Sequence, residues 1–160
     1  MSIEHRSAVL ALKLVMAALF AVLLVFQFLS FPGGIAYDAQ QHPEQAYLRW
    51  PLTFLAGFCV FCAEVVVFST WKLLGLVQSD RIFSDAAFKW VNTIIWAIAG
   101  GWPVLVSLLV WVFSHADDPG FPMVLLFFVL AVSVVGLLMI VMRVLLRQAT
   151  ALRTDMEAVI

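Results

Sequence analysis

Charged residues are scarce in this chain of 160 residues. Only 12% of the residues are Asp, Glu, Lys or Arg, whereas hydrophobic residues make up 64%. Ordinary soluble domains carry about 25% charged residues. A water-soluble core of this length could not hide so much apolar surface, so we expect lipid to cover part of it. The shortage of polar sequence also leaves no room for a separate soluble domain.

Catalytic motifs are missing as well. The sequence contains no nucleophile motif, phosphate-binding loop or dinucleotide fingerprint, so we expect no enzyme activity and no cofactor. Its two cysteines, Cys59 and Cys62, form a C-x-x-C inside an apolar stretch, and no histidine follows them as haem attachment requires. A redox pair or a metal site needs solvent access or more ligands. We therefore interpret both cysteines as packing residues and expect no metal site.

The chain does have four long apolar runs, at residues 9–31, 52–71, 93–113 and 122–142. Each is long enough to cross a bilayer, which takes about 20 apolar residues in a helix. The first run exceeds the usual apolar core of a signal peptide, so we expect an uncleaved anchor. The runs predict an all-α, integral membrane four-helix bundle that forms a single transmembrane domain over residues 1–160.

The lysines and arginines predict the orientation of this bundle. If the first and last segments lie on the same side of the membrane, eight of the nine basic residues fall in segments on that side. These eight are Arg6, Lys13, Lys72, Arg81, Lys89, Arg143, Arg147 and Arg153. Short cytoplasmic segments are enriched in Lys and Arg, so both termini are predicted to be cytoplasmic. The location that follows is the cell membrane.

Proline and glycine suggest where the first helix ends. Pro32-Gly33-Gly34 follows the first run and is expected to stop the helix, which makes 32–50 a loop on the outer side. Pro51 would lie in the first turn of the next helix, where its missing N–H costs nothing.

The connector at residues 76–90 has the pattern of a structured segment. Ser84 is expected to cap a helix that begins at Asp85, whose negative charge suits a helix N-terminus. Phe83 and Phe88 have the spacing of a hydrophobic staple. The helix is expected to continue without a break into the third apolar run.

The last segment, residues 143–160, is predicted to be an amphipathic cytoplasmic tail that continues the fourth helix. Its apolar residues recur at helical spacing and are Leu145, Ala149, Leu152, Met156 and Val159. Three alternatives stay open for this stripe: it lies on the membrane surface, packs on the 76–90 connector, or binds a partner.

Glu64 is the most unusual residue, because it is an acidic group near the middle of the second run. A charge at that depth costs about 2.5–3.5 kcal/mol on insertion scales, so it should face protein and find a partner. Lys13 in the first run is the candidate, which gives an intramembrane charge pair. Thr53 and Gly57 on the same face suit close helix contact. The pair could be structural, Glu64 could be protonated, or Glu64 could bind a proton or cation.

The third run contains Gly100-Gly101-Trp102-Pro103 near its middle. Pro103 removes a helical hydrogen bond and the glycines loosen the backbone, so a helix kink is expected. Such breaks line ion sites in some transporters and are also ordinary in membrane helices.

Taken as a whole, the chain resembles the bacterial membrane family called domain of unknown function 2975. The resemblance rests on the four spans, on Ile82-Phe83-Ser84 in the connector and on the ending Leu152 to Ile160. Many members end in an acidic residue followed by Leu-Thr-Ile, whereas this chain ends Ala158-Val159-Ile160 and lacks the threonine. The family has no established activity. The resemblance implies, as a candidate partner, the small helix-turn-helix DNA-binding protein that is often encoded beside its members.

Two functions from different classes follow. The first is a non-enzymatic membrane regulator or sensor that binds a cytoplasmic partner, with the bilayer as its surroundings, no direct contact to nucleic acid, and homo-oligomers left open. Its expected partner-binding residues are Phe83, Ser84, Asp85, Leu152, Asp155, Met156, Glu157 and Ile160. The second is a small transporter or channel-like subunit that uses Glu64 and the break at Pro103.

Overall fold

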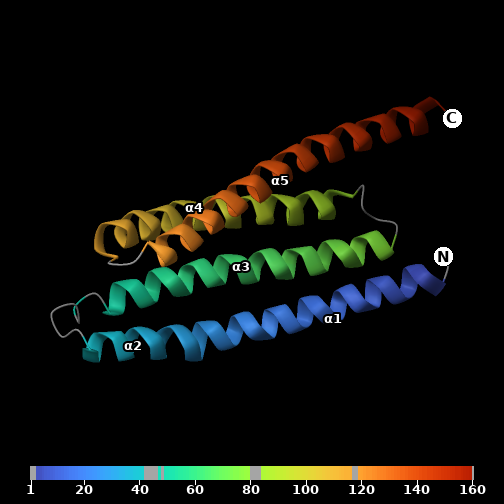
Figure 1. Ribbon diagram of the computed structural model, residues 1–160. Coiled ribbons are helices and arrows are strands. Elements are labelled where there is room, and N and C mark those ends of the chain that lie inside the picture. Colours follow the sequence, from blue (N-terminus) through green and yellow to red (C-terminus); the bar gives the residue numbers. More distant parts are fainter. Residues whose placement is uncertain (1–2, 42–46, 48, 80–83, 117–118, 160) are drawn as a thin grey trace. The chain divides into compact units, whose positions relative to one another are not determined.

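The computed structural model describes residues 3–41, 47, 49–79, 84–116 and 119–159, and all regular structure in these ranges is helical (Figure 1). Four helices are long and apolar enough to cross a membrane: Ser7–Tyr37, Arg49–Gln78, Asp85–His115 and Gly120–Met156. The prediction of an all-α chain with four membrane spans is therefore confirmed. The cytoplasmic placement of both termini stays a prediction.

Contacts divide the chain into two compact units, Met1–Phe68 and Ser69–Ile160. The first unit contains helix α1 (Ile3–Val25), the π-helical segment η1 (Phe26–Ser30), helix α2 (Phe31–Gln41) and helix α3 (Arg49–Gln78) as far as Phe68. The segments α1, η1 and α2 follow one another without a break. Pro51 is the third residue of α3, in its first turn as predicted.

The expectation that Pro32-Gly33-Gly34 stops the first helix is wrong, because α2 contains all three residues. Pro32 is the second residue of α2, directly after the π-helical segment, and it has no N–H to donate to the preceding turn. Just before it, η1 has the wider π-helical turn, and the N–H of Phe31 donates to the carbonyl of Phe26. Lipid offers the backbone no hydrogen bonds, so continued helix is favoured over an open loop despite the two glycines.

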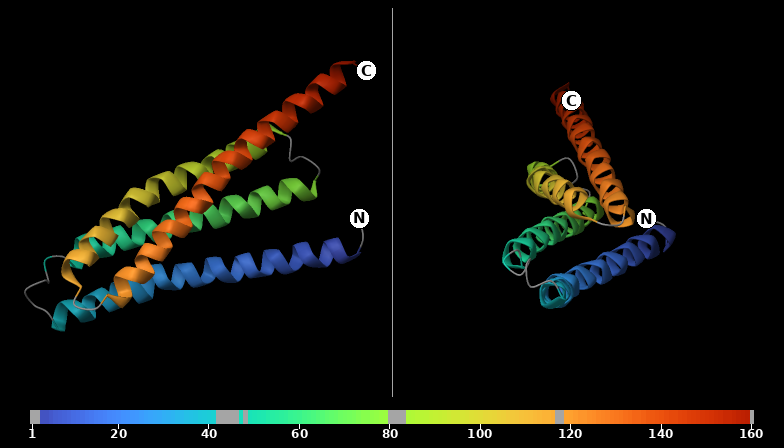
Figure 2. Two further views of the ribbon diagram at one scale, coloured as in Figure 1. Left: turned by 45° about the horizontal axis from the view of Figure 1, so that its top comes forward. Right: turned by 60° about the vertical axis from the view of Figure 1, so that its left-hand side comes forward.

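The second unit contains the end of α3, helix α4 (Asp85–His115) and helix α5 (Gly120–Val159). The helices α4 and α5 pack on each other, and α5 then continues past the start of α4 (Figures 1 and 2). At the contact, a Cβ added to Gly136 would lie 3.0 Å from Cγ2 of Ile98. Nearby, Nε1 of Trp102 donates a 2.8 Å hydrogen bond to Oγ of Ser133. The apolar core of α4 is formed by Ala87, Val91, Ile94 and Val112.

The start of α4 confirms the predicted boundary but corrects the predicted cap. The helix begins at Asp85, and Ser84 occupies the N-cap position with an extended backbone (φ −96°, ψ 158°). Its side chain makes no capping hydrogen bond. The N-cap contributes instead through its carbonyl, which accepts from the N–H of Ala87 at 3.0 Å. The staple with Phe83 lies outside the described residues.

The helix α4 runs unbroken through Gly100, Gly101 and Pro103. Pro103 lies inside the helix and has no N–H, so the carbonyl of Ala99 lacks its usual intrahelical donor. The continuity of α4 from Asp85 into the third run is confirmed, while a kink at Pro103 stays a prediction.

Candidate functional site

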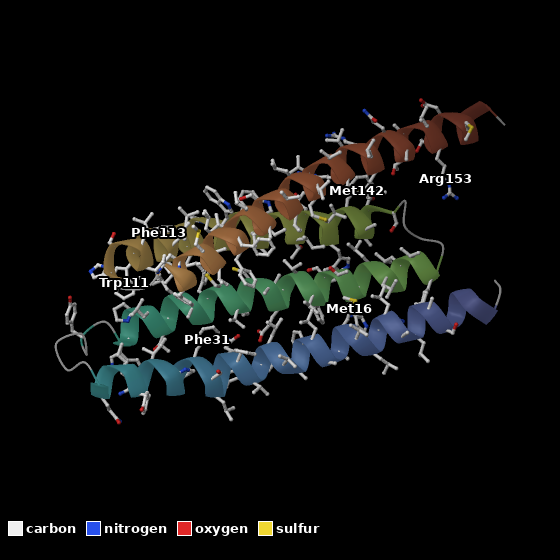
Figure 3. All side chains as sticks on the ribbon, viewed as in Figure 1. Met16, Phe31, Trp111, Phe113, Met142 and Arg153 are labelled. Atoms are coloured by element: carbon white, nitrogen blue, oxygen red, sulfur yellow. The ribbon has the colours of Figure 1, made fainter. Side chains whose placement is uncertain are left out.

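A groove of about 470 Å³ lies between the first turn of α4 and the second half of α5. Met142 and Arg153 mark this part of α5 in Figure 3. The groove residues are Asp85, Phe88, Arg143, Arg147, Thr150, Ala151 and Thr154. Its walls therefore come from the two segments, connector and tail, that the sequence singled out for partner binding.

Two arginines dominate the charge of this groove. Arg143 and Arg147 are four residues apart and share one face of α5, about 6 Å apart along the axis. Within the described part of the chain, neither guanidinium group forms an ion pair or a hydrogen bond, although Asp85 lines the same groove. Like charges at this spacing repel each other by a few tenths of a kcal/mol. With two arginines and one aspartate, the groove therefore carries one net positive charge.

The hydroxyl groups of the groove are satisfied within their own helix. Oγ1 of Thr150 donates to the carbonyl of Leu146 at 2.8 Å, and Oγ1 of Thr154 donates to the carbonyl of Thr150 at 3.0 Å. Each hydroxyl oxygen keeps its capacity to accept a hydrogen bond. The threonines thus add acceptors rather than free donors.

The apolar stripe of the tail lies on the opposite face of α5. Arg143, Arg147, Thr150 and Thr154 follow one another at intervals of four, three and four residues. The stripe residues Leu145, Ala149, Leu152 and Met156 repeat these intervals two positions later, and two residues rotate a helix by about 200°. Leu145, Leu152 and Met156 are accordingly 53%, 65% and 67% exposed. The polar face of the tail, not the stripe, is turned toward the connector.

The expected partner-binding residues therefore separate into two groups. Asp85 lies in the groove, with Ser84 beside it at the N-cap, whereas Leu152 and Met156 lie on the opposite, exposed face. Asp155 is also exposed. Phe83, Ile160 and the side chain of Glu157 lie outside the described residues.

A second polar site lies within the first unit, where Gln27 faces Glu64. The carboxamide nitrogen of Gln27 donates to Oε1 of Glu64 at 3.0 Å and to Oε2 at 3.3 Å when the amide presents its nitrogen to the carboxylate. Glu64 is only 7% exposed, as expected for an acidic residue that faces protein. Gln27 belongs to η1, and single π-helical turns are frequent at functional sites.

This geometry favours Gln27 over Lys13 as the neighbour of Glu64. Lys13 precedes Gln27 by 14 residues, which is about 20 Å of helix. A direct contact of Lys13 with Glu64 would need a shift of α1 along α3, and the Lys13–Glu64 pair stays a prediction. Gln27 was not among the residues predicted to contact Glu64, although a lone amide in an apolar run is a usable signal.

Close helix contact at Gly57 is not found in the described structure. A Cβ added there would meet nothing within 4 Å. Gly57 instead lines a pocket of about 390 Å³ together with Gln27 and Thr53, whose hydroxyl donates to the carbonyl of Arg49 at 2.7 Å. The rest of this pocket is aromatic and consists of Trp50, Phe54, Phe58 and Phe61.

Metal-ligand types do not gather in the described residues. No group of three or more His, Cys, Asp or Glu side chains is arranged to hold an ion there. Cys59 and Cys62 are free thiols and partly buried on α3, an environment in keeping with packing residues.

Comparison with known proteins identifies a family. The family model described as "Protein of unknown function (DUF2975)" matches residues 33–160. The chain belongs to this family. No curated protein and no solved structure matches it.

The two candidate sites differ in how much of each falls within the DUF2975 match. The groove residues and the exposed stripe all fall within 33–160, as does Glu64. Lys13 and Gln27 precede the matched segment. The groove is therefore built entirely from the part of the chain that defines the family, and the Gln27–Glu64 site only in part.

Proposed function

We propose that this chain is a non-enzymatic membrane regulator or sensor whose C-terminal tail binds a soluble protein on the cytoplasmic side. The observation that carries the proposal is the apolar stripe of the tail on α5, in which Leu145, Leu152 and Met156 are exposed and Ala149 is half-buried. Because α5 turns its polar face toward α4, no described helix of the second unit covers Leu145, Leu152 and Met156. An amphipathic helix with a free apolar face binds the hydrophobic groove of a partner.

The family resemblance supplies the class of partner. A helix-turn-helix DNA-binding protein encoded beside the gene would be held at the membrane when bound to the tail and released when the tail is occupied or rearranged. The regulator itself would not touch nucleic acid. Homo-oligomers stay open in this scheme.

Binding of that neighbouring protein to the full-length chain in lipid nanodiscs tests the proposal. The double substitution Leu152→Ser and Met156→Ser removes two apolar side chains, each worth about 1.5–3 kcal/mol when buried. We expect the affinity to fall at least tenfold. The matched control is Arg143→Gln with Arg147→Gln, on the opposite face of the same helix, which should bind the partner as the parent does. Unchanged binding by the stripe variant would overturn the proposal.

The Gln27–Glu64 site supports a second candidate function, a small transporter or channel-like subunit. The amide of Gln27 can serve both charge states of Glu64: its N–H groups donate to the carboxylate, and after a half-turn its oxygen accepts from the protonated acid. Buried acidic groups of this kind occur in proton relays. The test is proton flux into liposomes with the parent and with Glu64→Gln. Flux that is absent from the parent, or equal in both proteins, would exclude this candidate.

A further inference from the structure

The sequence positions of Arg143 and Arg147 place the arginine end of the groove between α4 and α5 at the level of the lipid head groups. Arg143 follows the apolar run 122–142 directly, so Arg143 and Arg147 lie about 1.5 Å and 7.5 Å beyond its end. The head-group layer is about 5–8 Å thick on each side of the hydrocarbon core. Both guanidinium groups therefore fall within the layer where lipid phosphates are found.

The acidic member of the groove lies farther from the hydrocarbon core. Asp85 precedes the third apolar run, 93–113, by eight residues, which is about 12 Å of helix. The groove therefore changes along its length, from two arginines near the hydrocarbon core to one carboxylate nearer water. A phospholipid head group has the complementary order, with its phosphate nearer the hydrocarbon core and its terminal polar group nearer water.

We propose that this groove binds the head group of a monoanionic phospholipid that carries hydroxyl groups. The phosphate lies between Arg143 and Arg147, where it relieves the repulsion between two guanidinium groups that have no other described partner. A head-group hydroxyl donates to the carboxylate of Asp85. The two arginines and Asp85 leave one net positive charge, which a monoanionic lipid neutralises and a zwitterionic lipid does not.

This inference is independent of the proposed protein partner, because the lipid and the partner would occupy opposite faces of α5. The two proposals can therefore fail separately.

Native mass spectrometry of the full-length protein tests the lipid site, with phosphatidylglycerol and phosphatidylcholine as the added lipids. We expect the parent to prefer phosphatidylglycerol. Each basic side chain near an anionic membrane surface increases the affinity about fivefold. The single variants Arg143→Gln and Arg147→Gln should therefore weaken binding about fivefold, and the double variant about thirtyfold. The control is Arg153→Gln, which makes the same charge change on the same helix outside the groove and should bind like the parent. Equal loss in the control, or no loss in the double variant, would overturn the proposal.

Two further arms define the ligand. Asp85→Asn should reduce the preference for phosphatidylglycerol over phosphatidic acid, which has no head-group hydroxyl beyond its phosphate, and an unchanged preference would contradict the role of Asp85. Added inorganic phosphate should not displace phosphatidylglycerol from the parent. Displacement would show that the arginines bind a soluble anion and would overturn the assignment to lipid.

Discussion

At the scale of single residues, Glu64 and Gln27 show how a membrane helix accommodates an acidic group. A carboxylate inside a lipid-embedded helix is costly unless donors face it. Gln27 offers both oxygens of Glu64 a hydrogen bond from a neutral side chain, and the π-helical turn at Phe26–Ser30 holds the residue that makes this contact. The pair thus stabilises a charge, or a proton, on a carboxyl group that is buried within the first unit.

We predict that Gln27 and Glu64 are energetically coupled. In a double-mutant cycle with Gln27→Leu and Glu64→Leu, the coupling should be about 0.6–2 kcal/mol, because hydrogen bonds inside membrane proteins average about 0.6 kcal/mol and bonds to charged groups are stronger. The measurement is the free energy of unfolding in mixed micelles.

The same cycle with Lys13→Met tests the predicted charge pair. The distance along α1 leads us to expect a smaller coupling of Lys13 to Glu64 than of Gln27 to Glu64. The reverse order would show that the helices slide to bring Lys13 to the carboxylate and would contradict the present arrangement.

At the scale of elements, the contact between α4 and α5 depends on Gly136. A side chain at this position would approach Ile98 to 3.0 Å, which is closer than carbon atoms pack without strain. Small residues allow membrane helices to approach in this way, and the Trp102–Ser133 hydrogen bond adds a polar connection nearby.

Gly136→Ala is predicted to destabilise the α4–α5 pair by about 1 kcal/mol, since overpacking forces Ile98 to move. Gly100→Ala on α4 is the matched control, because a Cβ there meets nothing within 4 Å and alanine favours the helix. Thermal unfolding followed by circular dichroism measures both. Ile98→Ala in the Gly136→Ala background should restore part of the loss, and an equally large loss for Gly100→Ala would contradict the packing argument.

At the scale of the whole molecule, charge asymmetry and helix number define what the chain presents to each side of the membrane. The described helices supply four spans, and eight of nine basic residues belong to segments on the predicted inner side. The groove and the stripe both belong to the tail and the connector of that side. Orientation therefore decides which compartment contains the candidate partner.

We predict that Thr154 lies in the cytoplasm and that Ser114 lies outside. Single cysteines can be placed at each site in a background with Cys59→Ala and Cys62→Ala, which should fold like the parent if the native cysteines only pack. In intact cells, a membrane-impermeant maleimide should label Ser114→Cys and not Thr154→Cys until the membrane is opened. Labelling in the opposite pattern would invert the topology and place the tail outside.

Four features could be predicted from the sequence: the helical class, the four spans, the start of α4 at Asp85 and the continuation of α5 into the tail. These features depend on local composition, on periodicity and on the need of a lipid-embedded backbone to satisfy its own hydrogen bonds. At Pro32-Gly33-Gly34, the local preference for a turn predicted that the helix would stop. The need of the backbone for internal hydrogen bonds outweighs this preference, and the helix continues through α2.

Which residues meet depends on how the helices pack in three dimensions. Residue spacing gives the faces of a helix but neither the rotation of one helix against another nor their register. The register between the first two apolar runs places Gln27 beside Glu64. Alignment of the midpoints of these two runs would not have paired the two residues. The rotation turned Arg143 and Arg147 toward Asp85 and left Leu152 and Met156 exposed. Rotation and register depend on side-chain packing between segments far apart in the chain, such as Ile98 against Gly136, and this packing is not encoded in any single stretch of sequence.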